Sequence, residues 1–259
     1  MANYTKCFTL TGGDVAENHK GMQKIGEMAQ HGFTKEDLDI ARQWFADRGC
    51  DTQIIKLHNR LPRELRADNK AYVLIIKNGV NTLLQNDNGA NDFYNEQDAL
   101  EKDTKALMYG RVVNKHARHN LCFSDVAQPP NYMEGMGTIV AFNSVPLLNT
   151  IRERLGEALP AAANLQFEGN YYHDVSMCGI GWHGDSERFK VVGIRLGASI
   201  PLVYCWFHNN VNITPVITMP QLEHGDIYIM SHKATGNDWK RKTQYTLRHA
   251  AGANKYIVL

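Results

Sequence analysis

A histidine and an aspartate two positions apart, His183 and Asp185, follow the apolar run Met177–Trp182. Residues with this spacing on a strand point to the same side, so both side chains can reach one ion. A third ligand from a distant strand would complete a 2-His-1-carboxylate set, which suits Fe(II) centres that activate oxygen. We expect this ligand to be His232, at the end of the apolar segment Asp226–Met230.

Four other histidines of this half of the chain compete for the same role. His224 opens a turn before a Gly-Asp pair, His208 lies in a His-Asn-Asn turn, and His173 fits a place near the substrate. His249 follows Arg248, and alternation along a strand sends the two to opposite faces. Because we place Arg248 on the inner face, we expect His249 to point away from the metal.

Arg248 lies in the apolar segment Tyr245–Arg248, where a guanidinium needs an acidic partner. The partner could be a core carboxylate of the protein. It could also be the distal carboxylate of a co-substrate such as 2-oxoglutarate, which an arginine can bind bidentately. The combination with His183, Asp185 and His232 favours the co-substrate.

Several segments, in this order, resemble the Fe(II)/2-oxoglutarate-dependent dioxygenases of the AlkB-like superfamily, most closely the TET/JBP group. The resemblance covers roughly residues 105–259 and includes segments 170–172, 179–188, 222–226, 230–233 and 246–252. It implies a jelly-roll core, Fe(II) held by His183, Asp185 and His232, and 2-oxoglutarate and O2 as co-substrates, with ascorbate as a possible stimulant. It also implies that Asn170 and Tyr172 contact 2-oxoglutarate together with Arg248.

Two departures from the AlkB repair enzymes guide the choice of reaction. Lys242 stands where those enzymes carry a second arginine, and the stretch from His232 to Arg248 is shorter than theirs. The spacing favours hydroxylation of the methyl group of thymine or 5-methylcytosine in nucleic acid, with release of succinate and CO2. The alternatives are an AlkB-type N-demethylase, an oxygenase acting on a protein or small molecule, and a non-catalytic jelly-roll module that binds nucleic acid.

Contacts to nucleic acid would have to come from local patches, because the formal net charge is only +1. One basic stretch contains Arg111 and Arg118, and another contains Arg241 and Lys242. Each could equally be a solvated loop. The pair Glu187-Arg188 is placed to contact a substrate beside the metal. A base in a DNA duplex would have to flip out to reach the iron.

These residues require a β-rich core to position them. Short apolar segments punctuated by Gly, Asn and Pro predict strands, at 166–172, 178–183, 190–197, 200–207, 213–218, 225–231, 243–249 and 254–258. Helices are predicted at 14–48 and 144–158, a hairpin at 72–84 around Asn-Gly, and a loop at 85–97. We expect an α+β, mostly β fold, a double-stranded β-helix (jelly roll) buttressed by N-terminal helices. It would form one domain over 1–259, with 1–104 as a helical and hairpin support region and 105–259 as the catalytic core.

The five cysteines are scattered and show no CxxC spacing, which fits a reducing compartment and argues against a structural zinc site. We see no signal peptide and no apolar span of membrane length. The sequence therefore predicts a soluble intracellular protein of the cytoplasm or nucleus, not secreted and with no membrane contact. It indicates no obligate protein partner.

Overall fold

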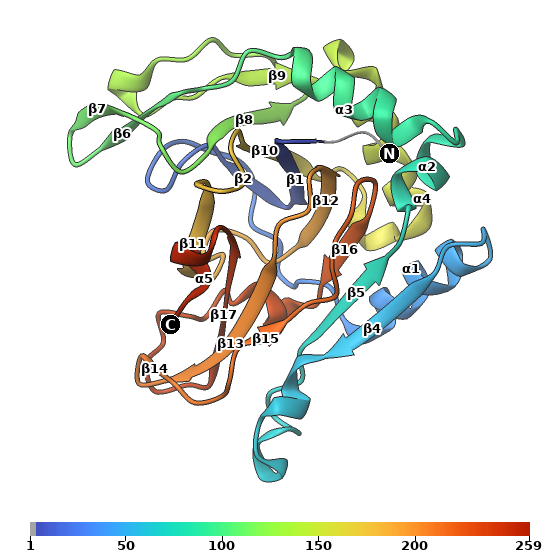
Figure 1. Ribbon diagram of the computed structural model, residues 1–259, viewed down its shortest axis with the longest axis vertical. Helices are drawn as coiled ribbons and strands as arrows, with labels where there is room; N and C mark the ends of the chain where they lie inside the picture. The colour runs from blue at the N-terminus through green and yellow to red at the C-terminus, as the bar shows by residue number, and fades with distance from the viewer. Residues whose placement is uncertain (1–3) are drawn as a thin grey trace.

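The computed structural model describes residues 4–259, which form a β-rich structure with helices along one side (Figure 1). An eight-stranded sheet has the order β4-β5-β16-β12-β1-β10-β8-β9. Its strands are β1 (Cys7–Gly13), β4 (Thr52–Lys56), β5 (Tyr72–Ile76), β8 (His119–Ser124), β9 (Ile139–Ala141), β10 (Gln166–Tyr172), β12 (Val191–Gly197) and β16 (Ile227–Met230).

A smaller sheet has the order β11-β17-β13-β14, and β15 also pairs with β13. Its strands are β11 (Gly179–His183), β13 (Leu202–His208), β14 (Val211–Asn212), β15 (Ile217–Thr218) and β17 (Thr246–Gly252). Two hairpins stand outside the sheets: β2 (Val15–Glu17) with β3 (Lys24–Gly26), and β6 (Lys105–Met108) with β7 (Arg111–Asn114).

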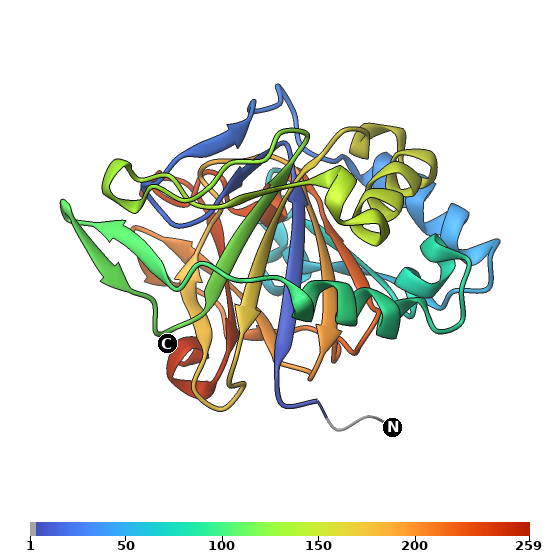
Figure 2. The same ribbon diagram turned by 90° about the horizontal axis from the view of Figure 1, so that it is seen from above.

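The helices are α1 (Lys35–Ala46), α2 (Gly79–Leu84), α3 (Gly89–Ala99), α4 (Pro146–Ala158) and the short C-terminal α5 (Asn254–Ile257). The first four cover the outer face of the large sheet (Figure 2). In α4, Leu148, Ile151 and Leu155 recur every three or four residues and are buried, so one face of the helix packs on the sheet. Each such side chain contributes about 1.5–3 kcal/mol when removed from water.

The other face of the large sheet packs against the small sheet. A second core cluster joins Val191 and Tyr228 of the large sheet to Trp206 and Leu247 of the small one. β-Strands alternate between facing in and facing out, so the same strands that supply this core can also aim polar side chains into the space between the sheets. The candidate site lies in that space.

Several predicted elements are confirmed. The helix at 144–158 is α4, and most of the strands predicted from residue 166 to 249 form within a few residues of their expected limits. Thr34 caps α1 through a reciprocal capping box with Asp37. The N-terminal-half helices buttress one sheet, as expected.

Four local predictions are wrong. Residues 14–33 contain the β2–β3 hairpin rather than helix, and 254–257 form a helical turn rather than a strand. The Asn-Gly pair makes no hairpin: Asn78, at φ 55°, is the N-cap of α2, and Val80 N–H donates to Gly225 O. This tertiary contact outweighs the local turn preference of the Asn-Gly pair. The predicted loop at 85–97 contains α3.

The N-terminal region does more than support the core. β1 lies in the middle of the large sheet, antiparallel to both β10 and β12, from which it is separated by more than half of the chain. Within residues 4–259, none of the helices combines the length and apolar character needed to cross a membrane.

Candidate metal centre and its two cavities

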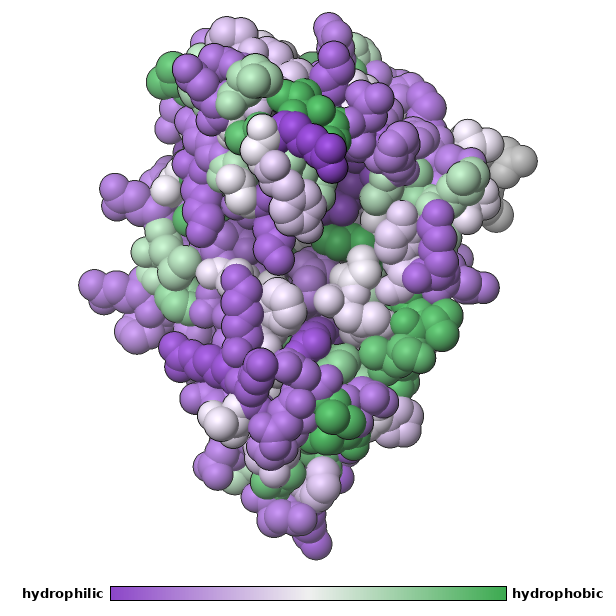
Figure 3. All heavy atoms as spheres, turned by 90° about the vertical axis from the view of Figure 1, so that its left-hand side faces the viewer, coloured by the Kyte–Doolittle hydropathy of each residue, from purple (hydrophilic) through white to green (hydrophobic). Residues whose placement is uncertain are grey.

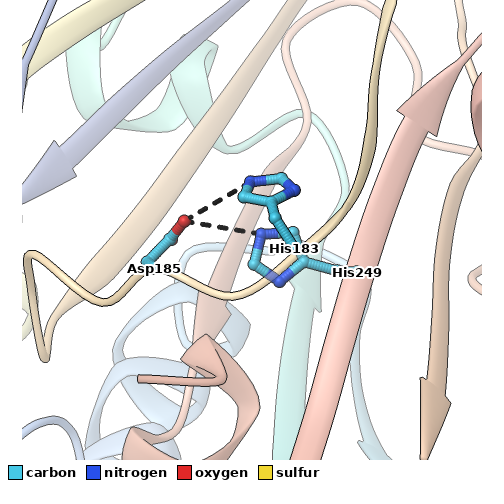
Figure 4. Close-up of side chains that lie close together, drawn as sticks. All are labelled: His183, Asp185 and His249. Atoms are coloured by element: carbon cyan, nitrogen blue, oxygen red, sulfur yellow. Dashed lines mark ion pairs between the residues drawn. The ribbon is translucent and has the colours of Figure 1, made fainter. Parts of the chain in front are cut away.

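Three side chains converge between the sheets and offer ligand atoms that all lie within 4.8 Å of one another: His183, Asp185 and His249 (Figure 4). We call them the candidate triad. Asp185 Oδ1 lies 3.5 Å from His183 Nε2 and 3.6 Å from His249 Nε2. His183 on β11 and His249 on β17 are cross-strand partners, so their rings emerge on the same face. Two imidazoles and one carboxylate at this spacing can share one divalent ion.

The backbone around the His-x-Asp pair is fixed from two sides. His183 Nδ1 lies 2.7 Å from Gly181 O. Because a carbonyl oxygen can only accept, Nδ1–H is the donor, and the lone pair of Nε2 is left for a metal. Asp185 N–H donates to Thr235 O. Gly184 packs so closely on Gly236 that an added Cβ would lie 2.1 Å from its carbonyl oxygen. The glycine between the two ligands is therefore required by this close approach.

The protonation of the pair suits a metal ligand. Burial and the neighbouring His249 lower the pKa of His183 to about 3, so its ring is neutral at pH 7. Burial alone would raise the pKa of Asp185, but the positive potential of His249 and Arg188 outweighs it and lowers the pKa, keeping the group ionised. A neutral imidazole and a carboxylate are the forms that bind a metal ion.

His232, our expected third ligand, lies elsewhere, and that expectation is corrected. Its Nδ1 accepts a hydrogen bond of 3.0 Å from the backbone N–H of Gly32, and its ring packs 4.6 Å from that of Phe189. It lines a separate cavity of about 220 Å³. The segment η6 (His232–Thr235) still serves the site, because Thr235 holds the backbone of Asp185.

His249 takes the place of His232 because β17 faces the other way from our expectation. Alternation does separate Arg248 from His249, but it is the histidine that points inward. The signal was available in the sequence: Leu247, His249 and Ala251 share one face, and both apolar neighbours belong to the core between the sheets. Arg248 lies on the opposite, outer face.

A narrow cavity of about 60 Å³ lies between the sheets and is lined by all three members of the triad. We call it the inner cavity. Arg195 of β12 also lines it and is 1% exposed, and among residues 4–259 its side chain has only the sulfur of Cys7 as a hydrogen-bond partner, at 3.5 Å. No carboxylate of residues 4–259 lies within 4.0 Å of this guanidinium. Its cross-strand neighbour Thr9 lines the same cavity, and Thr9 Oγ1 and Arg195 Nε both lack partners.

Arg248, expected to bind the co-substrate, is not in this cavity. Its Nη2 donates to Asn210 Oδ1, and its guanidinium carbon lies 4.2 Å from the ring centroid of Phe207 on the outer face of the small sheet. The expectation for Arg248 is therefore corrected, and Arg195 is the cation that shares a cavity with the triad. Sequence reasoning missed it although β12 is also an apolar strand with one arginine.

Asn170 and Tyr172 line the inner cavity together with the candidate triad. Asn170 Oδ1 accepts from Arg118 Nε at 2.6 Å and from Asn120 Nδ2 at 2.9 Å. Its own Nδ2 donates to Glu168 Oε1. These hydrogen bonds fix the orientation of the Asn170 amide and hold the Arg118 side chain at the edge of the site.

A larger opening of about 560 Å³, which we call the outer pocket, reaches His183 and Asp185 from the molecular surface. Glu187 and Arg188 line it, as do Arg118, Trp182, Trp239 and the segment 17–21. Arg188 is 3% exposed and forms ion pairs with Glu168 at 2.7 Å and with Glu187 at 2.9 Å. It is thus held at the wall of the pocket rather than free in solvent.

The remaining predicted contact residues lie away from the triad. Arg111 is exposed on the β6–β7 hairpin, which projects from the body of the molecule in Figures 1 and 2. Arg241 lines the cavity of His232, and Lys242 is exposed beside it. The face that carries this hairpin and β11 is largely hydrophilic around a hollowed centre (Figure 3).

A buried carboxylate anchors one wall of the outer pocket. Asp103, 3% exposed, accepts hydrogen bonds from Asn18 Nδ2, Tyr132 Oη, Thr138 N and Thr138 Oγ1, all between 2.6 and 2.7 Å. Asn18 itself lines the pocket. Asp103 thereby ties the segment after β2 to the core.

Replacing this carboxylate by an amide, Asp103→Asn, should lower the free energy of unfolding by about 2–4 kcal/mol, because a donor group replaces an acceptor that several buried groups share. Urea denaturation followed by circular dichroism measures the change. Asp98→Asn is the control, since the Lys6–Asp98 ion pair is exposed and should contribute less than about 1 kcal/mol. Equal effects of the two substitutions would contradict the anchoring role.

Over 258 residues the chain is 44% identical to the uncharacterized protein R156 of Acanthamoeba polyphaga mimivirus, and the match covers 99% of this chain and 100% of that protein. No model of a known protein family matches the chain.

Proposed function

We propose that this chain, which belongs to the same family as the uncharacterized mimivirus protein, is an Fe(II)/2-oxoglutarate-dependent oxygenase. Its substrate is the methyl group of a 5-methylpyrimidine, thymine or 5-methylcytosine, in nucleic acid. The observation that carries the proposal is the shared inner cavity: a 2-His-1-carboxylate set and a buried guanidinium without a protein counterion face the same space.

The sheet topology supports a double-stranded β-helix (jelly roll) as the scaffold. From β10 onward the chain alternates between the sheets: β10 in the large one, β11 in the small, β12 in the large, β13 to β15 in the small, β16 in the large and β17 in the small. Such alternation is how a jelly roll closes its two sheets on one core. In this chain β1 supplies the remaining central strand between β10 and β12.

The donor set fits iron in the divalent state. Two imidazoles and a carboxylate occupy one side of an ion and leave room for other ligands, as in non-heme Fe(II) oxygenases. His249 Nδ1 is buried and lacks a partner, whereas its Nε2 faces Asp185. When bound, the iron would supply activation of O2 coupled to oxidative decarboxylation of 2-oxoglutarate to succinate and CO2.

The polar groups that line the inner cavity match the chemistry of the co-substrate. A dicarboxylate with one end at the triad would place its other carboxylate near Arg195 and Thr9, whose Nε–H and Oγ1–H have no hydrogen-bond partners in the described part of the chain. A charge-assisted pair would remove the cost of burying Arg195 alone. Asn170 and Tyr172 form a further part of the wall and would orient the molecule.

The outer pocket fits the substrate. At about 560 Å³ it is in the size range of small-molecule sites and reaches the triad at His183 and Asp185. The inner cavity and the outer pocket share these two residues together with Glu168 and Ile180, so co-substrate and substrate would meet at the metal. The protein's contribution is to hold the methyl group there and to limit access of water.

Mass spectrometry of nucleosides tests the proposal. Purified protein is incubated with Fe(II), ascorbate, 2-oxoglutarate and DNA or RNA, and succinate is measured in parallel. We expect one added oxygen on thymidine or 5-methylcytidine and none with Asp185→Ala, which lacks the carboxylate ligand. Loss of an N-methyl group would instead indicate a demethylase. Succinate formed only with protein or small-molecule substrates would refute the nucleic-acid substrate, and absence of turnover with every substrate would favour a binding module.

A further inference from the structure

Two tryptophans stand at the mouth of the outer pocket. Trp182 comes from β11, next to His183, and Trp239 follows η6; both line the pocket and are partly exposed. The indole N–H of Trp182 donates to Val258 O, which fixes that ring. Neither ring is needed to complete the core between the sheets, so their positions call for an explanation in terms of a ligand.

Arg248 extends this aromatic surface across the outer face of the small sheet. Its guanidinium lies between Phe207, at 4.2 Å, and Trp239, at 5.2 Å. Stacking of this kind holds a guanidinium flat. Nη2 donates to Asn210 Oδ1 and Nε is buried, which leaves the Nη1 side of the guanidinium for an anion. Among residues 4–259 no carboxylate lies within 4.0 Å of Arg248.

Further cations surround the same mouth. Lys20 and Lys240 are exposed, and each Nζ lies 5.8 Å from the ring of Trp239. Lys24, also exposed, lines the pocket with them. Within the described residues, none of these three lysines has a carboxylate within 4.0 Å. The rim therefore combines aromatic side chains with these lysines, while four acids also line the pocket: Glu17, which is the cross-strand neighbour of Lys24, and Glu168, Asp185 and Glu187.

We propose that this surface binds a single-stranded segment of nucleic acid, in which the nucleotide next to the target base stacks on Trp239 and its phosphate pairs with Arg248 and Lys240. The inference rests on the proposed function, in that the target base occupies the outer pocket. Indole faces bind bases that are free of a partner base, and unpaired cations bind phosphates. An acidic peptide would satisfy the cations but would leave the indole faces without a flat ring to stack on.

Binding of a fluorescein-labelled thymidine 12-mer, followed by fluorescence anisotropy, tests the inference independently of turnover. Trp239→Leu should weaken binding by about tenfold or more, the range for loss of one stacked base. Arg248→Gln should weaken it and reduce the slope of log affinity against log salt by about 0.7. The matched control is Arg48→Gln: Arg48 also stacks on a tryptophan, 3.7 Å from Trp44, but belongs to the α1 side of the molecule, and its loss should leave binding unchanged.

Three results would overturn the inference: wild-type protein that does not bind the 12-mer, Trp239→Leu and Arg248→Gln proteins that bind it as tightly as wild type, or a blunt duplex that binds at least as tightly as the single strand. Thermal melts of both variants confirm that they are folded before binding is compared. Weaker binding by the two variants in a protein that never forms succinate would support the surface and refute the proposed chemistry. Oxidation of nucleosides by the wild type, together with unchanged 12-mer binding by the two variants, would support the proposed chemistry and refute the binding surface.

Discussion

His249→Ala is expected to abolish both iron binding and succinate formation, whereas His232→Ala leaves both close to wild type. His249 provides one of only three protein ligands in the candidate triad, and its Nε2 faces the carboxylate that would share the ion. Even removal of a group that merely orients a ligand costs about 10–100-fold in metal affinity. Loss of the ligand itself should therefore weaken affinity by at least about 100-fold.

Anaerobic calorimetric titration with Fe(II) measures this affinity directly, and a succinate assay follows turnover. His232→Ala is a demanding control, because it also removes an imidazole from the same half of the chain. It should lose the acceptor for Gly32 N–H and the ring contact with Phe189, a cost of about 1–2 kcal/mol in stability that leaves the candidate triad in place. Metal binding that survives His249→Ala but fails in His232→Ala would restore the sequence-based assignment and contradict the geometry of β17.

The sequence predicts local chemistry better than it predicts which face of a strand is buried. His183 and Asp185 are separated by one residue, and a two-residue period is enough to place both on one side. The third ligand depends on β17, where the choice between Arg248 and His249 is a choice between two faces. Only the apolar neighbours Leu247 and Ala251, in phase with His249, indicate the correct one.

The two arginines also differ in whether their strand face is covered. Both Arg195 and Arg248 lie in strands that are otherwise apolar, so burial near an anion could be argued for either. The structure distinguishes them because β12 runs through the centre of the large sheet, where both faces are covered, whereas β17 turns one face outward. Central placement of β12 depends in turn on β1, which pairs with it although more than half of the chain separates the two strands.

The N-terminal region shows where sequence reasoning ends. Nothing local in Cys7–Gly13 reveals that this strand inserts between β10 and β12, because its partners are far away in the sequence. The Asn-Gly pair after β5 has the composition of a hairpin turn, yet packing of Gly79 against Ile227 directs the chain into α2 instead. Local sequence patterns are enough to predict a β-rich fold and the pair His183 and Asp185. The positions of His249 and Arg195 depend on how distant strands pair.

Arg195→Met should raise the KM for 2-oxoglutarate by about 100-fold or more while the affinity for Fe(II) stays close to wild type. Truncating one member of a buried, hydrogen-bonded charge pair costs about 2–5 kcal/mol, and the carboxylate left behind would face an apolar wall. Arg248→Met should change this KM by less than about threefold, because its guanidinium lies on the outer face of the small sheet. Steady-state succinate assays with a saturating concentration of the thymidine 12-mer as substrate measure both values.

Stability without ligand distinguishes co-substrate binding by Arg195 from a purely structural role. If the guanidinium stabilised the fold, Arg195→Met would lower the melting temperature of the protein alone. We expect the opposite or no change, since the charge is 1% exposed and lacks a carboxylate partner within residues 4–259, so its burial costs free energy that methionine avoids. Addition of 2-oxoglutarate should raise the melting temperature of wild type and not of the variant. If the variant melts at a lower temperature and is still stabilised by 2-oxoglutarate, Arg195 does not bind the co-substrate. The inner cavity would then lack the cation that the proposed function assigns to it.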